Sequence, residues 1–441
     1  MIINRNWKYN FSSKFFIIIS VLYVLIHPHL RIEKLYALNF EDPLHGYYKK
    51  IAEDPFSKII KKIENGSITL NYDSNYNYLN SLLRELNITP ESQLLVYSNT
   101  SLQLSRISPR NPRAIYFSDD IYLGYVPGGQ VEIIGIDPQI GAIPYIFNLP
   151  HAQDLKHPPI YRSKRCMKCH ASKEMGGSPG LLIGSAIPGP GGGSIDAFRR
   201  KLSGHEVPFD QRFGGWHITG NHPFENSWAN HTGMIENGTT IKIPNPPGMQ
   251  FNWGKYLTKH SDIIPHLILE HQVGFTNRCL SVTYRFRELS KLKNKPTYEQ
   301  KVEQFVEKEA KSLLSYILFQ NEAFIPKNTI NPNTKFADFF VRKGITSLKG
   351  YSLNTLNLKN RLFNLRCSYM IFSNSFNGLP LVFKSHLLKK LNFILSCNTD
   401  QLPPKFSYME ENERIKIKAI LSESLDGFPK SKKKDAYWRP L

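Results

Sequence analysis

The chain has 441 residues, a formal net charge of +20 at pH 7 and 41% hydrophobic residues. This apolar content suffices for a packed core and excludes a disordered chain, and the length favours two to three structural units. The positive charge could attract acidic redox partners or anionic lipid, although base composition explains it better, and no recognisable motif accompanies it that would indicate nucleic-acid binding.

The N-terminal segment has the charge and apolar pattern that is typical of an export signal. Arg5, Lys8 and Lys14 precede the apolar run 15–26, which is shorter than the roughly 20 residues needed to span a bilayer. Ala37 is the best small residue for cleavage, so residues 1–37 are predicted to be a signal peptide; the alternative is an uncleaved anchor whose apolar run extends to Leu30. Under both interpretations the rest of the chain is exported to the periplasm or cell envelope. Membrane contact through the N-terminus is possible.

Residues 38–160 are predicted to form an N-terminal α+β region. Residues 38–90 have helix-compatible spacing, with a loop at 73–80 between two short helices. Turn residues separate β-rich runs at 94–97, 114–117, 121–126, 131–136 and 142–147, which predicts a small antiparallel meander. Asp119 and Asp120 could be read as paired carboxylates, but neighbouring residues at a strand end point in different directions, so we interpret them as turn formers.

The most informative motif is formed by Cys166, Cys169 and His170. Cys-x-x-Cys-His is the attachment signature of a c-type haem. Each thiol adds to one vinyl group of the porphyrin, the spacing puts both sulfurs on one helical turn, and the adjacent imidazole can bind the iron as the proximal ligand. The sequence therefore predicts one covalently attached haem c.

The remaining cysteines do not support the alternative of a structural zinc site. Such a site would need a second Cys or His pair at similarly short spacing, whereas Cys279, Cys367 and Cys397 are solitary and distant. A disulfide between Cys367 and Cys397 is an open alternative in an oxidising compartment.

Residues 161–294 are predicted to form a mainly helical, loop-rich haem region. The glycine-rich stretch 176–193 fits neither a phosphate loop nor a dinucleotide loop, so its backbone is predicted to pack against the porphyrin. The histidines and tryptophans of residues 212–231 suggest a haem surrounding, although each histidine taken alone is better interpreted as a surface residue. A helix is predicted from the N-cap Ser261 to about residue 292. Its His266 and His271 are five positions apart and cannot bind one metal from the same face, so we reject a zinc-protease site.

Residues 295–441 are predicted to form a helical C-terminal region. A capping box of Thr297 and Gln300 precedes an apolar stripe that ends near Leu318, and further helices are expected at 335–343, 380–395 and 410–425. The basic tail from residue 432 is expected to be solvated, with its aromatic residues docked. The predicted fold class is thus α+β, with a small antiparallel β-meander before the haem region and helices at the end.

The Cys166–His170 motif resembles that of c-type cytochromes. The chain is also similar to uncharacterised exported monohaem cytochrome proteins of bacterial envelopes in the segments 111–117, 214–222, 260–272 and 366–369. The resemblance covers roughly residues 110–290 and part of the C-terminal region. It implies haem binding, export and membership of the electron-transfer proteins, and it carries no assigned reaction.

Three functions are compatible with one such motif. The leading hypothesis is a cytochrome that passes electrons through its iron to a redox partner protein, for which the positive charge would favour an acidic one. The alternative is a monohaem enzyme or sensor with an open distal site, suited to peroxide or NO chemistry, which the length of chain around the motif favours somewhat. In the third, the haem stabilises a binding module.

The distal iron ligand is the least determined part of the predicted site. His271 is the first choice because it lies within a helix among apolar residues, which gives a rigid position. His260 and Met249 are the alternatives. A core histidine that hydrogen-bonds to backbone is an equally good interpretation of His271.

Overall fold

The computed structural model describes residues 38–149, 160–199, 203–224, 226–326, 330 and 334–430. The predicted signal peptide or anchor at residues 1–37 lies outside them, and so do residues 150–159, before the Cys-x-x-Cys-His motif, and the tail from residue 431. Every helix in the described ranges is too short or too polar to span a bilayer. From Leu38 onwards the chain forms one compact unit, so the three regions distinguished in the sequence share one body.

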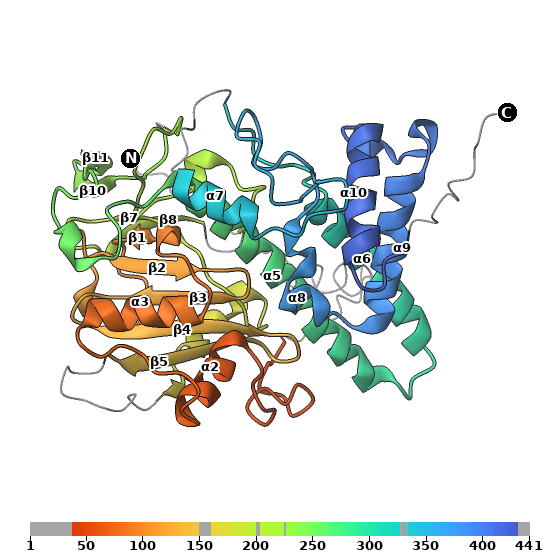
Figure 1. Ribbon diagram of the computed structural model, residues 1–441, viewed down its shortest axis with the longest axis horizontal. Coiled ribbons are helices and arrows are strands. Elements are labelled where there is room, and N and C mark those ends of the chain that lie inside the picture. Colours follow the sequence, from red (N-terminus) through yellow and green to blue (C-terminus); the bar gives the residue numbers. More distant parts are fainter. Residues whose placement is uncertain are drawn as a thin grey trace, which may run out of the picture. The chain divides into compact units, whose positions relative to one another are not determined.

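A seven-stranded sheet of entirely antiparallel pairs lies at the centre of this unit (Figure 1). Its order is β6-β5-β4-β3-β2-β1-β9, so the predicted meander and the α+β fold class are confirmed. The strands are β1 (Leu94–Val96), β2 (Arg113–Phe117), β3 (Ile121–Tyr125), β4 (Gln130–Asp137), β5 (Gly141–Asn148), β6 (Tyr161–Arg162) and β9 (Trp216–His217).

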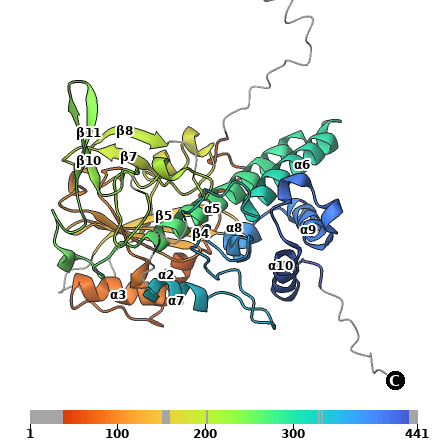
Figure 2. The ribbon, with the colours of Figure 1, turned by 90° about the horizontal axis from the view of Figure 1, so that it is seen from above.

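Two helices, α2 (Pro55–Glu64) and α3 (Asn75–Glu85), cover one face of the sheet (Figures 1 and 2). Each begins where the residue before it caps the free amides. Asp54 accepts a hydrogen bond of 2.9 Å from the Phe56 amide, and Ser74 accepts one of 3.1 Å from the Asn77 amide. Strand residues of the meander and helix residues such as Leu82 are buried together in one core cluster on this face.

The long helix α5 (Ile263–Leu289) lies on the other side of the sheet (Figure 2). Its N-cap is Asp262, whose side chain accepts a hydrogen bond of 3.0 Å from the Ile264 amide. The predicted N-cap, Ser261, is wrong because its hydroxyl donates to the His217 carbonyl at 2.6 Å and accepts from the Leu95 amide at 2.9 Å. Ser261 therefore ties the start of α5 to the sheet.

Two hairpins precede α5 where a mainly helical region was predicted. They consist of β7 (Ser185–Pro188) with β8 (Ser194–Arg199), and β10 (His231–Glu236) with β11 (Thr239–Pro244). The turn of the second hairpin contains Asn237 and Gly238 with φ values of 51° and 76°. Asn-Gly is the preferred sequence for a two-residue hairpin turn because both positions need positive φ. The Asn-Gly pair is a local signal for this hairpin, which was not among the predicted elements.

The predicted C-terminal helices are confirmed to within a residue. They are α6 (Tyr298–Ile317), α7 (Thr334–Arg342), α9 (Leu381–Ser396) and α10 (Glu411–Ser424), and a short helix α8 (Asn374–Asn377) precedes α9. Thr297 makes no side-chain hydrogen bond at the start of α6, so the capping box is wrong. Cys367 and Cys397 are free thiols, and a disulfide between them is not present.

Asp119 and Asp120 lie in the bend between β2 and β3, and each also binds the C-terminal region. Asp119 Oδ1 accepts a hydrogen bond of 2.7 Å from Lys343 Nζ. The Asp120 carboxylate accepts from the Asn374 amide at 3.0 and 3.1 Å. The two carboxylates therefore join the sheet to α7 and α8 in addition to forming the turn.

Asp120→Asn is expected to raise the free energy of unfolding, relative to the natural protein, more at pH 8 than at pH 5. Burial raises the pKa of Asp120 to about 7, although the hydrogen bond from the Asn374 amide acts to lower it. A raised pKa means that the folded state holds the proton more tightly than the unfolded chain, so the stability of the natural protein falls as pH rises from about 4 to 7. Asparagine keeps the acceptor oxygen and carries no charge. We expect a difference of about 1–3 kcal/mol between the two pH values, reduced by the partial exposure of the side chain.

Urea unfolding of both proteins from pH 5 to pH 8 measures this difference. A stability difference between variant and natural protein that is the same at every pH would show that Asp120 does not titrate in this range. Asp119→Asn should reduce the pH dependence without abolishing it, because the neighbouring Asp119 carboxylate contributes to the raised pKa of Asp120.

Candidate functional site

The Cys-x-x-Cys-His motif forms a single helical turn, α4 (Met167–His170), directly after the edge strand β6. The Ser163 amide donates to the Pro144 carbonyl at 2.9 Å, which continues the pairing of β6 with β5. Ser163 Oγ then accepts a hydrogen bond of 3.3 Å from the Cys166 amide. Met167 is buried and its sulfur contacts the Tyr47 hydroxyl at 3.3 Å. The sheet edge thus fixes where the motif begins.

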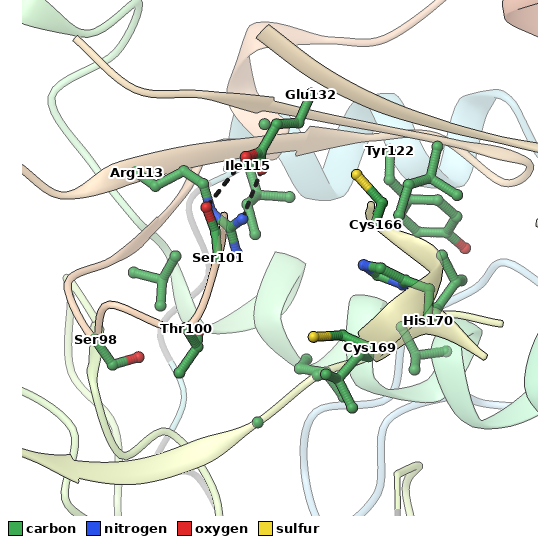
Figure 3. A pocket seen from close by; sticks show the side chains of 18 of the residues that line it. Ser98, Thr100, Ser101, Arg113, Ile115, Tyr122, Glu132, Cys166, Cys169 and His170 are labelled. Atoms are coloured by element: carbon green, nitrogen blue, oxygen red, sulfur yellow. Dashed lines mark hydrogen bonds and ion pairs between the residues drawn. The ribbon is translucent and has the colours of Figure 1, made fainter. Parts of the chain in front are cut away.

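Cys166, Cys169 and His170 line a cavity of about 360 Å³ (Figure 3). This volume lies within the range of small-molecule and cofactor sites. Part of the wall comes from the glycine-rich stretch, which therefore lies beside the motif. Its predicted packing against a porphyrin stays a prediction. The residues that it and the following hairpin contribute are mostly apolar, namely Leu181, Leu182, Ile183, Gly184, Ser185, Ala186, Ser194 and Ala197.

The His170 ring is held by a backbone carbonyl. Its Nδ1 lies 2.9 Å from the Gly180 oxygen, and the Gly180 amide donates to the His170 carbonyl at 2.8 Å. Burial lowers the pKa of His170, which favours the neutral imidazole. A neutral ring that donates from Nδ1 to a carbonyl has its lone pair on Nε2. Histidines that ligate metals are usually oriented by such a hydrogen bond.

Helix α5 fixes the segment that carries the Gly180 carbonyl. The Asn277 side chain accepts from the Leu181 amide at 2.8 Å and donates to the Leu181 carbonyl at 2.8 Å. This pair of hydrogen bonds holds the residue next to Gly180 in one orientation. Asn277 therefore supports His170 indirectly, through the loop that the imidazole contacts.

The two cysteines are free thiols that lie on either side of the His170 ring (Figure 3). Cys166 is half-buried and Cys169 is exposed. Burial raises the pKa of Cys166, although Ser163 opposes this effect. Within the described residues, no three His, Cys, Asp or Glu side chains are grouped so that they could hold a metal ion directly. Two separated thiols beside one oriented imidazole match the donor set that attaches a porphyrin and binds its iron.

The opposite side of the cavity combines apolar residues such as Ile115 with polar side chains and an ion pair (Figure 3). Arg113 Nη1 on β2 donates to Glu132 Oε2 on β4 at 2.9 Å, and both side chains are 17% exposed. Gly124 on β3 lies between them, and a Cβ built there would be 3.5 Å from Glu132 Oε2 and 3.6 Å from Arg113 Cδ. A Cβ would thus be in ordinary contact with both side chains, and the pair crosses the intervening strand at this residue.

Neutral donors complete the coordination of the Glu132 carboxylate. Its Oε1 accepts from Ser101 Oγ at 3.1 Å and from Gln103 Nε2 at 2.9 Å. Burial alone would raise the pKa of Glu132, but Arg113, Gln103 and Ser101 together lower it. The carboxylate is therefore ionised, and it fixes the position of the Arg113 guanidinium.

The structure does not bring His271 to this cavity. Its Nδ1 lies 2.8 Å from His205 Nδ1, its Nε2 lies 2.7 Å from Ser368 Oγ, and its ring stacks against Tyr316 and Phe319. The side chain is fully buried and both ring nitrogens have partners. His271 is therefore a core histidine, as in the alternative interpretation, but its ring nitrogens contact side chains and not the backbone. We do not retain it as an iron ligand.

The two alternative distal ligands also lie elsewhere. His260 Nε2 is 2.6 Å from Glu91 Oε2, and Met249 is 68% exposed. Neither residue lines the cavity. His266 contacts the Ser261 hydroxyl and the His217 carbonyl, so it faces different partners from His271, in agreement with the rejection of a shared metal.

Of the aromatic and histidine residues in the stretch 212–231, Trp216 is the one that lines the cavity in the described chain. Its indole donates to the Gly184 carbonyl at 2.9 Å, which ties β9 to the glycine-rich stretch. His217 is fully buried away from the cavity against Tyr97 and Phe251. Of the histidines and tryptophans in this stretch that were predicted to surround a haem, only Trp216 is among the described residues that line the cavity.

Comparisons with known proteins add no family to this description. No family model matches the chain, and neither the curated proteins nor the solved structures contain a match.

Proposed function

We propose that the protein is an exported c-type haem protein that carries one covalently attached haem and transfers electrons through its iron. The observation that carries this proposal is the convergence of Cys166, Cys169 and His170 on one cavity, with His170 Nδ1 held by the Gly180 carbonyl. Cys166 and Cys169 would form the two thioethers, and His170 Nε2 would be the proximal ligand. The bound haem supplies a one-electron ferrous–ferric couple.

The chain's own residues support this role by holding the imidazole and limiting solvent access. Asn277 fixes the loop that orients His170, and apolar residues from Leu181 to Ala186 form much of the wall. A fixed, neutral imidazole and an apolar wall both tune the potential of a bound iron. The export part of the proposal rests on residues 1–37, and the positive charge of the chain suits an acidic redox partner.

Production of the full chain with a haem maturation system tests the proposal. The exported protein should keep its haem through acid–acetone extraction and denaturation, because thioether bonds survive both. Its pyridine haemochrome spectrum should give one haem per chain, and a redox titration should follow a single one-electron step. Haem that is extracted completely from the natural protein would refute covalent attachment.

A second function, small-molecule chemistry at an open distal site, is favoured by the composition of the cavity. His170 is the one histidine among the described residues that line it, and no methionine or lysine does so. These are the side chains that most often supply a sixth ligand. Rapid binding of carbon monoxide to the ferrous protein would support the open site, and a slow or absent reaction would support electron transfer alone.

A further inference from the structure

We infer that Arg113, positioned by Glu132, is the hydrogen-bond donor for a small anion bound at the sixth coordination position of the haem iron. The inference rests on the haem attachment proposed above and assigns the ligand class of that same site. It follows from the placement of the Arg113–Glu132 pair in the cavity that also contains His170.

The first step is the position of the pair relative to the proximal ligand. An iron bound to His170 Nε2 presents its free position on the side away from the imidazole. In Figure 3 the thiols and His170 occupy one side of the cavity, and Ser101, Arg113 and Glu132 occupy the opposite side.

The second step is the hydrogen-bonding capacity that Arg113 retains. A guanidinium has five N–H donors, and Glu132 is the one hydrogen-bond partner that the described residues give Arg113. Its Nε is buried and has no partner within the described chain. A buried cationic donor without an acceptor destabilises the folded protein. A ligand that supplies the acceptor removes this penalty and therefore binds more tightly.

The third step is the rigidity of the arrangement. Glu132 is held by Ser101 and Gln103, and Gln103 in turn accepts from the Gln130 amide at 2.7 Å. Every oxygen of the carboxylate is therefore already occupied by a donor of the chain. Glu132 therefore serves as a positioning residue for Arg113.

Charge then selects the class of ligand. The Arg113–Glu132 pair is neutral as a whole, while a ferric porphyrin iron carries a net positive charge at its centre. An anion neutralises the iron and accepts from the guanidinium at the same time, and such charge-assisted hydrogen bonds are stronger than neutral ones. A neutral diatomic ligand gains little from Arg113.

Fluoride binding to the ferric protein tests this inference, because fluoride is a small anion that accepts hydrogen bonds and changes the visible spectrum of ferric haem. The natural protein should bind fluoride, and Arg113→Met should weaken its binding at least about tenfold at the same pH. The affinity of the ferrous form for neutral carbon monoxide should change far less. Arg84→Met is the matched control, because Arg84 forms an exposed pair with Glu85 on α3 and should leave both affinities unchanged.

A second variant guards against misfolding. Arg113→Met alone leaves Glu132 buried without its cation, whereas Arg113→Met combined with Glu132→Gln removes both charges and should fold with the same loss of fluoride affinity. Unchanged fluoride affinity in these variants would overturn the inference, and so would a change confined to the reduction potential, which would place Arg113 at another part of the haem. A natural ferric protein that is low-spin and does not bind fluoride would overturn it by showing an occupied sixth position. If the natural protein holds no covalent haem, the proposed function itself fails, and the haemochrome assay separates that outcome from the others.

Discussion

Replacing both Cys166 and Cys169 with alanine is expected to abolish the covalently bound haem. Each thiol can form one thioether, so the double variant has no atom left to which the porphyrin can be attached. Because both sulfurs lie beside the His170 ring in one cavity, the single variants should each retain one bond and a shifted haemochrome band. Denaturing gel electrophoresis with haem staining, followed by acid–acetone extraction, measures the loss.

Cys397→Ala is the control for this experiment. Cys397 is a free, partly exposed thiol that lies outside the cavity, so its removal should leave the haem content unchanged. Covalent haem that persists in the double variant at the level of the natural protein would contradict the assigned attachment residues. Equal loss in Cys397→Ala would indicate a general folding defect in place of a lost bond.

Gly378→Ala is expected to destabilise the protein by about 3 kcal/mol or more, the upper part of the range for overpacking. A Cβ at this position would overlap the carbonyl group of Pro138, which lies in the turn between β4 and β5. That turn is rigid, since Asp137 Oδ1 accepts from the Gln139 and Ile140 amides at 2.6 and 2.7 Å. Neither the turn nor α8 can move away without losing contacts between the sheet and the C-terminal helices. Urea or thermal unfolding measures the loss.

Gly191→Ala is the matched control because it makes the same chemical change in open space. No atom lies within 4 Å of the Cβ that would be added at Gly191, and its φ is outside the left-handed region. The control should be neutral or slightly stabilising through the lower entropy of the unfolded chain. If the two variants had equal free energies of unfolding, the close approach of Gly378 to Pro138 would make no contribution to stability.

The strands and helices that the sequence predicted well are those with strong local signals. Turn residues bound each strand of the meander, and the apolar stripe after Thr297 identified α6 within a few residues. The short strands β6 and β9 were not predicted because two residues carry no period. In addition, β9 pairs with β1, which lies far earlier in the chain. The Asn237-Gly238 turn was a readable signal that was overlooked.

The candidate site was predictable only where its residues are adjacent in the chain. Cys166, Cys169 and His170 form a contiguous motif, whereas Arg113 and Glu132 meet across an intervening strand. Their pairing depends on the registers of Ile115 with Gly124 and of Gly124 with Glu132, which no local pattern reveals. Opposite charges within two otherwise apolar strand runs were the available hint.

His271 shows the converse difficulty. Its helix and apolar neighbours were read correctly, but the groups that satisfy its two nitrogens, His205 and Ser368, come from distant parts of the sequence. A single buried histidine looks the same in sequence whether it binds a metal or completes a core network. The distinction is made by tertiary contacts alone.

The strand order has a consequence for how the chain is assembled. From β1 to β6 every strand pairs with its neighbour in sequence, so most of the sheet closes short loops and can form as the chain emerges. The last pairing, Val96 with Trp216, must wait for residues that follow the cysteine motif. Trp216 also completes the cavity wall through Gly184. We therefore expect this side of the cavity to be completed last. Under the proposed haem attachment, Cys166 and Cys169 would be open to a maturation enzyme during that interval.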